Sequence, residues 1–244
     1  MLDYQLIRSA RRKTLLLQVK QGKVTVRAPA RLPLTQIKAF INNKSTWLKQ
    51  KLAEQHLTSQ QGNTVKQVTF TQNSPLLYLG VEHTLNIEFA QKSAIYINEL
   101  TITVVLSYRQ QSNIEASHGE AAQHELIKQV RKKLSTFFKQ QLHNYLIEKL
   151  PIFASHCQVT PLSYKVRFYK TRWGSCNSRD ELSFNYLLML LPSWVIDYVI
   201  IHELCHLKHL NHGKLFWQLV EQHCPNYKSA ITWLKTHQQQ LIWQ

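Results

Sequence analysis

Acidic residues, cysteine pairs and long apolar runs are scarce or missing in this sequence. The 244 residues include 14 Asp and Glu against 30 Lys and Arg, which gives a formal net charge of +16 at pH 7. Cys157, Cys176, Cys205 and Cys224 form no Cys-x-x-Cys pair, which favours reduced thiols over a disulfide framework or a zinc ribbon. The longest apolar tract, residues 186–201, is broken by proline, serine and aspartate, so we expect no membrane span.

The start of the chain also lacks the features of an export signal. Asp3 precedes the first basic residues, and the apolar run that follows them, residues 14–19, is too short for a signal-peptide core. The hydrophobic content of 44% is that of a globular protein, and 244 residues suffice for one large domain or two small ones. We therefore expect a soluble, cytoplasmic protein.

Positive charge is concentrated in two blocks. Residues 1–60 contain 12 Lys and Arg against 2 acidic residues, and residues 121–180 contain 11 against 3. Such blocks attract nucleic acid or anionic substrates through long-range steering. A solvated basic surface is an equally good interpretation, because charge alone specifies no partner.

The first segments predict a hairpin followed by a helix. Two β-prone runs, residues 14–19 and 24–28, flank a Gln-Gly-Lys turn that is typical of a β-hairpin. After Pro33, apolar residues recur at helical spacing, which predicts a helix over residues 34–55.

A polar linker, residues 56–66, then leads into four β-prone runs within residues 68–108, which predict a small antiparallel sheet. We expect these segments, which lie within residues 1–110, to form a β-rich N-terminal unit that contains one helix. The polar segment 109–122 marks the expected boundary, and a second domain over residues 120–244 follows it.

The second domain is predicted to mix helices and strands. A long helix with a period of three to four residues ends at Pro151, and residues 164–171 alternate as a strand does. A Gly- and Ser-containing turn, residues 172–181, precedes an apolar segment, and Pro192 opens a further helix. The fold class is therefore α+β.

That last helix carries a His-Glu-x-x-His motif. His202 and His206 are four residues apart, so on a helix they lie on one face and converge on a tetrahedral zinc at about 2.0–2.1 Å from each nitrogen. Glu203 projects beside them and reaches a water molecule rather than the metal. A buried Glu203 without a partner is costly, and a metal-water centre supplies that partner.

The third ligand has three candidates. On a continued helix His209 lies about 10 Å along the axis from His202, which is too far to share one ion. His212 lies in the Asn-His-Gly segment 211–213, whose residue types favour a left-handed turn that ends the helix there and folds the chain back. Glu221 is the fallback ligand if this reversal fails. Three histidines leave one zinc position open, which indicates catalysis rather than a structural site.

Several motifs together resemble one known family. They are "KTRWGSC" at residues 170–176, "HELCHLKHLNHGKLFW" at 202–217 and an N-terminal "RRKTLLLQV…VTVRAPA" followed by "WLKQKL". The sequence resembles the YgjP-like metal-dependent hydrolases, relatives of the SprT-type zinc metallopeptidases, over nearly its whole length. The resemblance implies a zincin-like C-terminal domain, with the active-site helix beside a small sheet.

The resemblance also implies roles for individual residues. His202, His206 and His212 would bind Zn²⁺, Glu203 would be the catalytic acid and base, and the "RWGSC" hairpin and the segment around Asn185 would lie beside the active-site helix. Arg172 and Asn185 are our candidates for substrate-binding polar groups. The alternative is local, with Arg172 pairing nearby and Asn185 bonding to backbone.

We therefore expect a zinc-dependent hydrolase and, within that class, a metallopeptidase that acts on protein or peptide substrates. One alternative is a metal-dependent hydrolase of nucleoside triphosphates, of the pyrophosphatase type. Another is a nucleic-acid-associated protein with structural zinc. Glu203 favours catalysis over the last alternative, because structural zinc sites do not need it.

Overall fold

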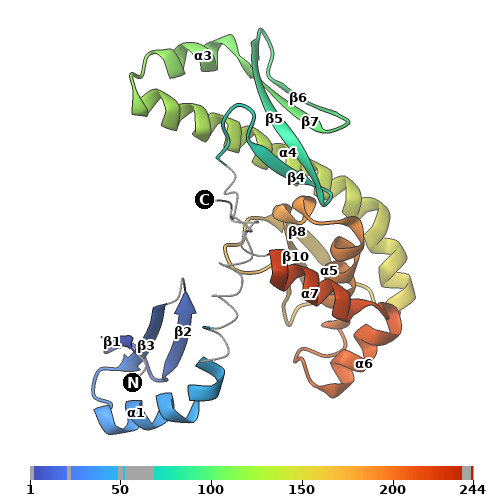
Figure 1. Cartoon of the computed structure of the whole chain (residues 1–244). Helices are drawn as coiled ribbons and strands as arrows, with labels where there is room; N and C mark the ends of the chain where they lie inside the picture. The colour runs from blue at the N-terminus through green and yellow to red at the C-terminus, as the bar shows by residue number, and fades with distance from the viewer. Residues whose placement is uncertain (1–2, 21–22, 49–51, 53–68, 238–242, 244) are drawn as a thin grey trace. The chain divides into compact units, whose positions relative to one another are not determined.

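The chain forms two compact units, residues 1–65 and 66–244. The computed structural model describes residues 3–20, 23–48, 52, 69–237 and 243 (Figure 1). Among the described helices, none combines the length and the apolar character that are needed to cross a bilayer. The structure confirms the α+β class, with several helices and three small sheets.

The first unit is a three-stranded sheet with one helix. Its elements are β1 (Tyr4–Ser9), β2 (Leu16–Lys20), β3 (Lys23–Pro29) and α1 (Leu34–Asn43). The β2–β3 pair is antiparallel, which confirms the predicted hairpin, whereas its turn residues 21–22 lie outside the described residues. β1, which the sequence analysis did not predict, joins the other side of β3 in parallel.

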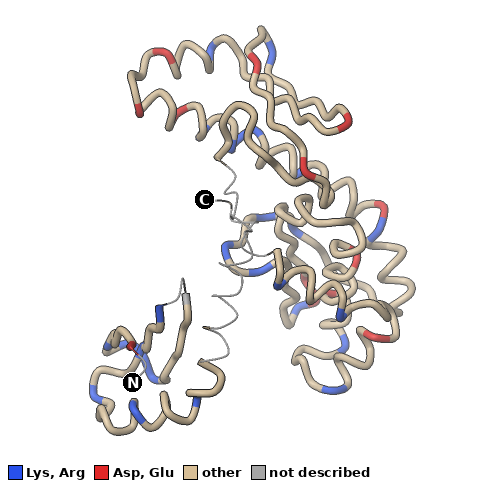
Figure 2. Tube along the Cα trace, in the orientation of Figure 1, with Lys and Arg blue, Asp and Glu red and all other residues tan. Residues whose placement is uncertain are grey.

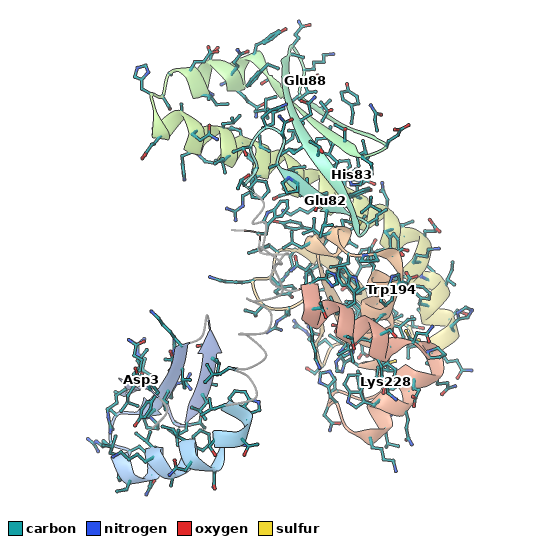
Figure 3. All side chains as sticks on the ribbon, viewed as in Figure 1. Asp3, Glu82, His83, Glu88, Trp194 and Lys228 are labelled. Atoms are coloured by element: carbon teal, nitrogen blue, oxygen red, sulfur yellow. The ribbon has the colours of Figure 1, made fainter. Side chains whose placement is uncertain are left out.

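Alternate residues of β3 and one face of the helical segment make the core of this unit. The buried side chains are Val24, Val26, Ala28, Ile37, Ile41 and Leu48. The predicted helix 34–55 is confirmed to Asn43; the backbone is helical again over 45–48, and residues 53–55 and the linker 56–66 lie outside the described part. Asp3 is the one acidic residue among the described residues of this unit, and Lys and Arg recur along its trace (Figures 2 and 3).

The second unit begins with a four-stranded sheet in the order β4-β5-β7-β6. Its strands are β4 (Pro75–Tyr78), β5 (Val81–Ala90), β6 (Ala94–Asn98) and β7 (Thr101–Ser107). All four β-prone runs are therefore strands. The expectation of a wholly antiparallel sheet is wrong, because β7 lies between β5 and β6 and pairs with β5 in parallel.

This sheet belongs with the C-terminal residues, so the division of the chain differs from the expected units 1–110 and 120–244. The polar segment after β7 is a helix, α3 (Tyr108–Glu115), which Ser107 caps, and it leads into α4 (Glu120–Cys157). Ile102 and Val104 of β7 are buried in the same core as Val130 and Leu134 of α4. The contact between sheet and helix places the division near residue 65 instead.

The helix α4 connects the two halves of the second unit. Figure 1 shows it running beside the four-stranded sheet and on to the C-terminal elements. It does not end at Pro151, as predicted, but continues to Cys157. Its buried stripe, which includes Leu146 and Leu150, continues past the proline with Ala154 and Cys157. Burial of that stripe outweighs the hydrogen bond that proline removes.

The C-terminal half places a small sheet against a buried helix. The sheet has the order β8-β10-β9, with β10 parallel to β8 and antiparallel to β9. The elements are β8 (Ser163–Arg167), β9 (Gly174–Cys176), β10 (Glu181–Asn185), the 3₁₀ helix η1 (Tyr186–Leu190), α5 (Ser193–Cys205), α6 (Lys214–His223) and α7 (Tyr227–His237). The predicted strand and the helix that Pro192 opens are both present.

The Tyr145 side chain links α4 to α5 by hydrogen bonds, and its bond to Asp197 gives a stability prediction. Tyr145 Oη donates to Asp197 Oδ1 at 2.6 Å, and burial raises the pKa of Asp197. In Tyr145→Phe the partly buried carboxylate loses its donor, so the free energy of unfolding should fall by about 1–3 kcal/mol. Chemical denaturation measures the change. Tyr96→Phe, at a 58% exposed tyrosine, is the control, and equal stability of the two variants would contradict the prediction.

Candidate functional site

The site is built at the C-terminal end of α5. This helix starts after Pro192 and is apolar on nearly all faces, so most of it is buried, whereas Trp194 near its start is partly exposed (Figure 3). Its last turn contains Glu203, and His206 caps it with helical backbone angles. The rigid, buried helix therefore fixes the spacing of His202 and His206.

Three imidazoles converge beside this helix end. His212 Nε2 lies 3.1 Å from His202 Nε2 and 3.1 Å from His206 Nε2. All three ligand atoms lie within 4.8 Å of one another, and no other such group of His, Cys, Asp or Glu occurs in the described part of the chain. Glu82, His83 and Glu88 of β5 (Figure 3) form no such group. The structure thus brings together the three histidines that the sequence analysis selected.

The chain reverses earlier than the sequence predicted, and by another route. α5 ends at Cys205 rather than at the Asn-His-Gly segment 211–213, and the backbone N–H groups of Lys208 and His209 both donate to the Cys205 carbonyl. No residue from 206 to 213 has a positive φ, and Gly213 is extended, with φ −74°. The Asn211 side chain instead accepts a hydrogen bond from Gly213 N at 3.2 Å. A helical turn followed by this side-chain cap brings His212 back, so no left-handed residue is required.

In His202 and His206 the hydrogen bonds are made by Nδ1, so Nε2 is available for a ligand. His206 Nδ1 lies 3.0 Å from the His209 carbonyl, which only accepts, so Nδ1 carries the proton. The Tyr198 hydroxyl lies 3.3 Å from His202 Nδ1. Burial lowers the pKa of His202 to about 3, which keeps this imidazole neutral. Neutral imidazoles with Nε2 free are the form that binds a metal ion.

Two aromatic rings of α6 form one wall of the site. Phe216, which is fully buried, stacks on His206 with 4.5 Å between ring centroids and meets His202 edge-on at 4.9 Å. Trp217 stacks on His212 at 5.6 Å. Both rings pack α6 against the core of the second unit. They also hold the imidazole planes, and their contacts have no signal in the local sequence.

Glu203 follows His202 on α5, and its carboxyl packs against the strand β9. Its side chain is 6% exposed, and no described donor hydrogen bonds to its carboxylate. Burial raises the pKa of Glu203 to about 8, while the positive charge of Arg172 acts in the opposite direction. A Cβ placed on Gly174 of β9 would lie only 2.6 Å from Glu203 Oε1, so the absence of a side chain there makes room for the carboxylate.

The two substrate-binding candidates differ: the Asn185 side chain is used in hydrogen bonds within the protein, whereas the Arg172 side chain is exposed. Asn185 is buried, and its Nδ2 donates to the Tyr169 carbonyl at 2.8 Å and to the Arg172 carbonyl at 3.0 Å. Its Oδ1 accepts from Leu187 N, so the amide is fully used within the protein. Arg172 is exposed and its guanidinium lies over the Tyr169 ring. Asn185 therefore shapes the loop before β9, and Arg172 faces solvent.

The three histidines fit a tetrahedral ion. Two imidazole nitrogens bonded to one zinc ion at tetrahedral angle lie about 3.3 Å apart. The two separations from His212 Nε2, both 3.1 Å, are close to that value, and all three ligand atoms lie within 4.8 Å of one another. Because the proton of His206 is on Nδ1, the lone pair of its Nε2 faces the other two rings. Glu221, the fallback ligand, pairs instead with Lys228, and His209 contributes only its carbonyl.

Three converging imidazoles and a buried glutamate on the same helix are typical of a metallohydrolase site. Residues 13–237 match the YgjP-like family, a metallopeptidase domain. The chain therefore belongs to the YgjP-like family, and its class is that of metal-dependent peptidases. No curated protein and no solved structure gives a significant match to the chain.

Proposed function

We propose that the protein is a zinc-dependent peptidase in which His202, His206 and His212 bind the metal and Glu203 is the general base and acid. The single observation that carries this proposal is the convergence of the three Nε2 atoms at the end of the helix that also carries the buried Glu203. When bound, zinc would polarise the carbonyl under attack and make water a nucleophile at neutral pH.

Glu203 has the position and the freedom for proton transfer. Its carboxylate is held by the buried helix and by the backbone of β9, and no hydrogen bond from a described donor competes for its oxygens. We propose that it accepts a proton from the attacking water and later passes it to the leaving amine. A fixed carboxylate at this place lowers the entropic cost of aligning the reacting groups.

The strand β9 supports a peptide as the substrate. It is an edge strand of its sheet among the described residues, and it lies directly against Glu203. An edge strand offers backbone N–H and C=O groups that an extended peptide can pair with. We also propose a cytoplasmic location, on the basis of the cysteine spacing in the sequence.

Metal analysis combined with a substrate screen tests the proposal. The purified protein should bind one zinc ion per chain and cleave peptides in a proteome-derived library, and a chelator should stop cleavage until zinc is added back. The variant His212→Ala should bind zinc more weakly and lose cleavage. Chelator-sensitive hydrolysis of nucleoside triphosphates without any peptide cleavage would overturn the assignment, as would full cleavage by the metal-free protein.

A further inference from the structure

A positively charged loop borders the proposed site. Arg167 ends β8, Lys170 and Arg172 follow in the connection to β9, and all three side chains are exposed. None of them forms an ion pair with an Asp or Glu in the described part of the chain. Arg172 lies two residues before Gly174, whose backbone is in contact with the Glu203 carboxyl, so the loop is close enough to influence a substrate there.

The loop is held in one arrangement by residues of the neighbouring strands. The buried Asn185 of β10 donates to the carbonyls of Tyr169 and Arg172, and the Asn185 backbone N–H donates to the Trp173 carbonyl at 2.8 Å. The Tyr169 hydroxyl lies 3.0 Å from Ser175 Oγ on β9. The loop is thus tied both to β10 and to the strand that touches Glu203.

Two guanidinium groups share one aromatic ring in this loop. Arg167 Cζ lies 5.5 Å and Arg172 Cζ 5.4 Å from the centroid of the Tyr169 ring. The ring attracts each cation, but it does not neutralise their charge. Two like charges near one another favour a bound anion, and a guanidinium presents paired N–H donors that match the two oxygens of a carboxylate.

We propose that Arg167, Tyr169 and Arg172, the cationic loop, bind acidic side chains of the substrate, so that the enzyme prefers peptides with Asp or Glu near the bond that it cuts. This inference rests on the proposed peptidase function. Phosphate groups of a nucleic acid would also suit guanidinium donors. A peptide carboxylate is favoured here, because the loop is anchored to β9, beside the catalytic carboxylate, in a chain of the metallopeptidase class.

Paired substrates test the preference. Cleavage sites from a proteome-derived peptide library would first identify the favoured acidic position. Two fluorogenic peptides that differ only by Glu or Gln there would then be compared. We expect kcat/KM to be about tenfold higher for the Glu peptide, as one charge-assisted contact provides. The preference should weaken with increasing salt.

Variants of the cationic loop test its origin. In Arg167→Gln/Arg172→Gln the ratio of kcat/KM for the Glu and Gln peptides should fall towards one, and Arg172→Glu should shift preference towards a Lys peptide. Arg109→Gln, at an exposed arginine of α3, should keep the wild-type ratio. Unchanged zinc content and melting temperature would show that the variants fold.

The outcomes separate this inference from the function on which it rests. If the wild-type protein cleaves no peptide in the library, both fail. If it cleaves peptides with equal kcat/KM for Glu and Gln, or if the double variant keeps the ratio, the inference alone is wrong. Loop-dependent binding of a single-stranded DNA 20-mer, together with a Glu to Gln ratio of one, would make the loop a phosphate site and would also overturn it.

Discussion

Replacing Glu203 with Gln should lower kcat for peptide cleavage by about 10²–10⁴-fold, the usual contribution of a general base. The amide has nearly the same shape as the carboxyl, so the contact with β9 remains, but the amide cannot accept the proton. The three histidines are unchanged, and zinc content should therefore stay at the wild-type level. Steady-state kinetics on a fluorogenic peptide and metal analysis of the same preparation measure the two effects.

The result has a clear contrary outcome. Full activity in Glu203→Gln would show that proton transfer does not depend on this residue. Loss of zinc together with activity would assign Glu203 a structural role at the metal site. The thermal stability of this variant is informative as well, because the carboxyl is buried and no described donor hydrogen bonds to it. A neutral amide there should leave the melting temperature unchanged or raise it.

Local pattern accounts for most of the elements of the fold. Runs of β-prone residues predicted β2, β3 and all four strands of the larger sheet, alternation predicted β8, and Pro192 correctly marked the start of α5. The pairing of strands is not local, which explains why the parallel contact between β5 and β7 was missed. The boundary near residue 110 was placed on polarity, but the apolar face of β7 is covered by α4, and that contact keeps the sheet with the C-terminal residues.

In the site as well, local spacing could be predicted from the sequence and non-local contacts could not. Helical geometry relates His202 to His206 over four residues, and residue type predicted a chain reversal, although at residues 211–213 rather than directly after α5. Tyr198 lies one turn before His202, so helical spacing alone places it next to that ring. The route of the reversal was wrong, because a side-chain cap by Asn211 replaces the expected left-handed turn. Asn185 was expected near the site, but only the structure shows that loop carbonyls use its amide.

The contact between Gly174 and Glu203 joins residues 29 positions apart and has no local signal. It gives the second large prediction. In Gly174→Ala the new Cβ would lie 2.6 Å from Glu203 Oε1 and 2.7 Å from Glu203 Cγ, so the carboxylate or β9 must shift. A displacement of the order of 1 Å in a catalytic group costs about 10²-fold in rate. We expect kcat to fall by about that factor, with zinc still bound.

Two controls separate positioning from folding. Gly80→Ala places a Cβ 2.5 Å from Pro192 at a backbone φ of +80°, so it should lower the melting temperature and spare kcat. Gly174→Ala should lower kcat and leave the melting temperature nearly unchanged, because the backbone of Gly174 has no positive φ. A Glu203→Asp background gives the second control. Its side chain is one methylene shorter, so Gly174→Ala should lower kcat by a smaller factor there than in the wild type, because the colliding atoms lie farther from the new methyl group. Equal costs in both backgrounds would show that the methyl acts elsewhere, and wild-type kcat in Gly174→Ala would show that β9 does not position the base.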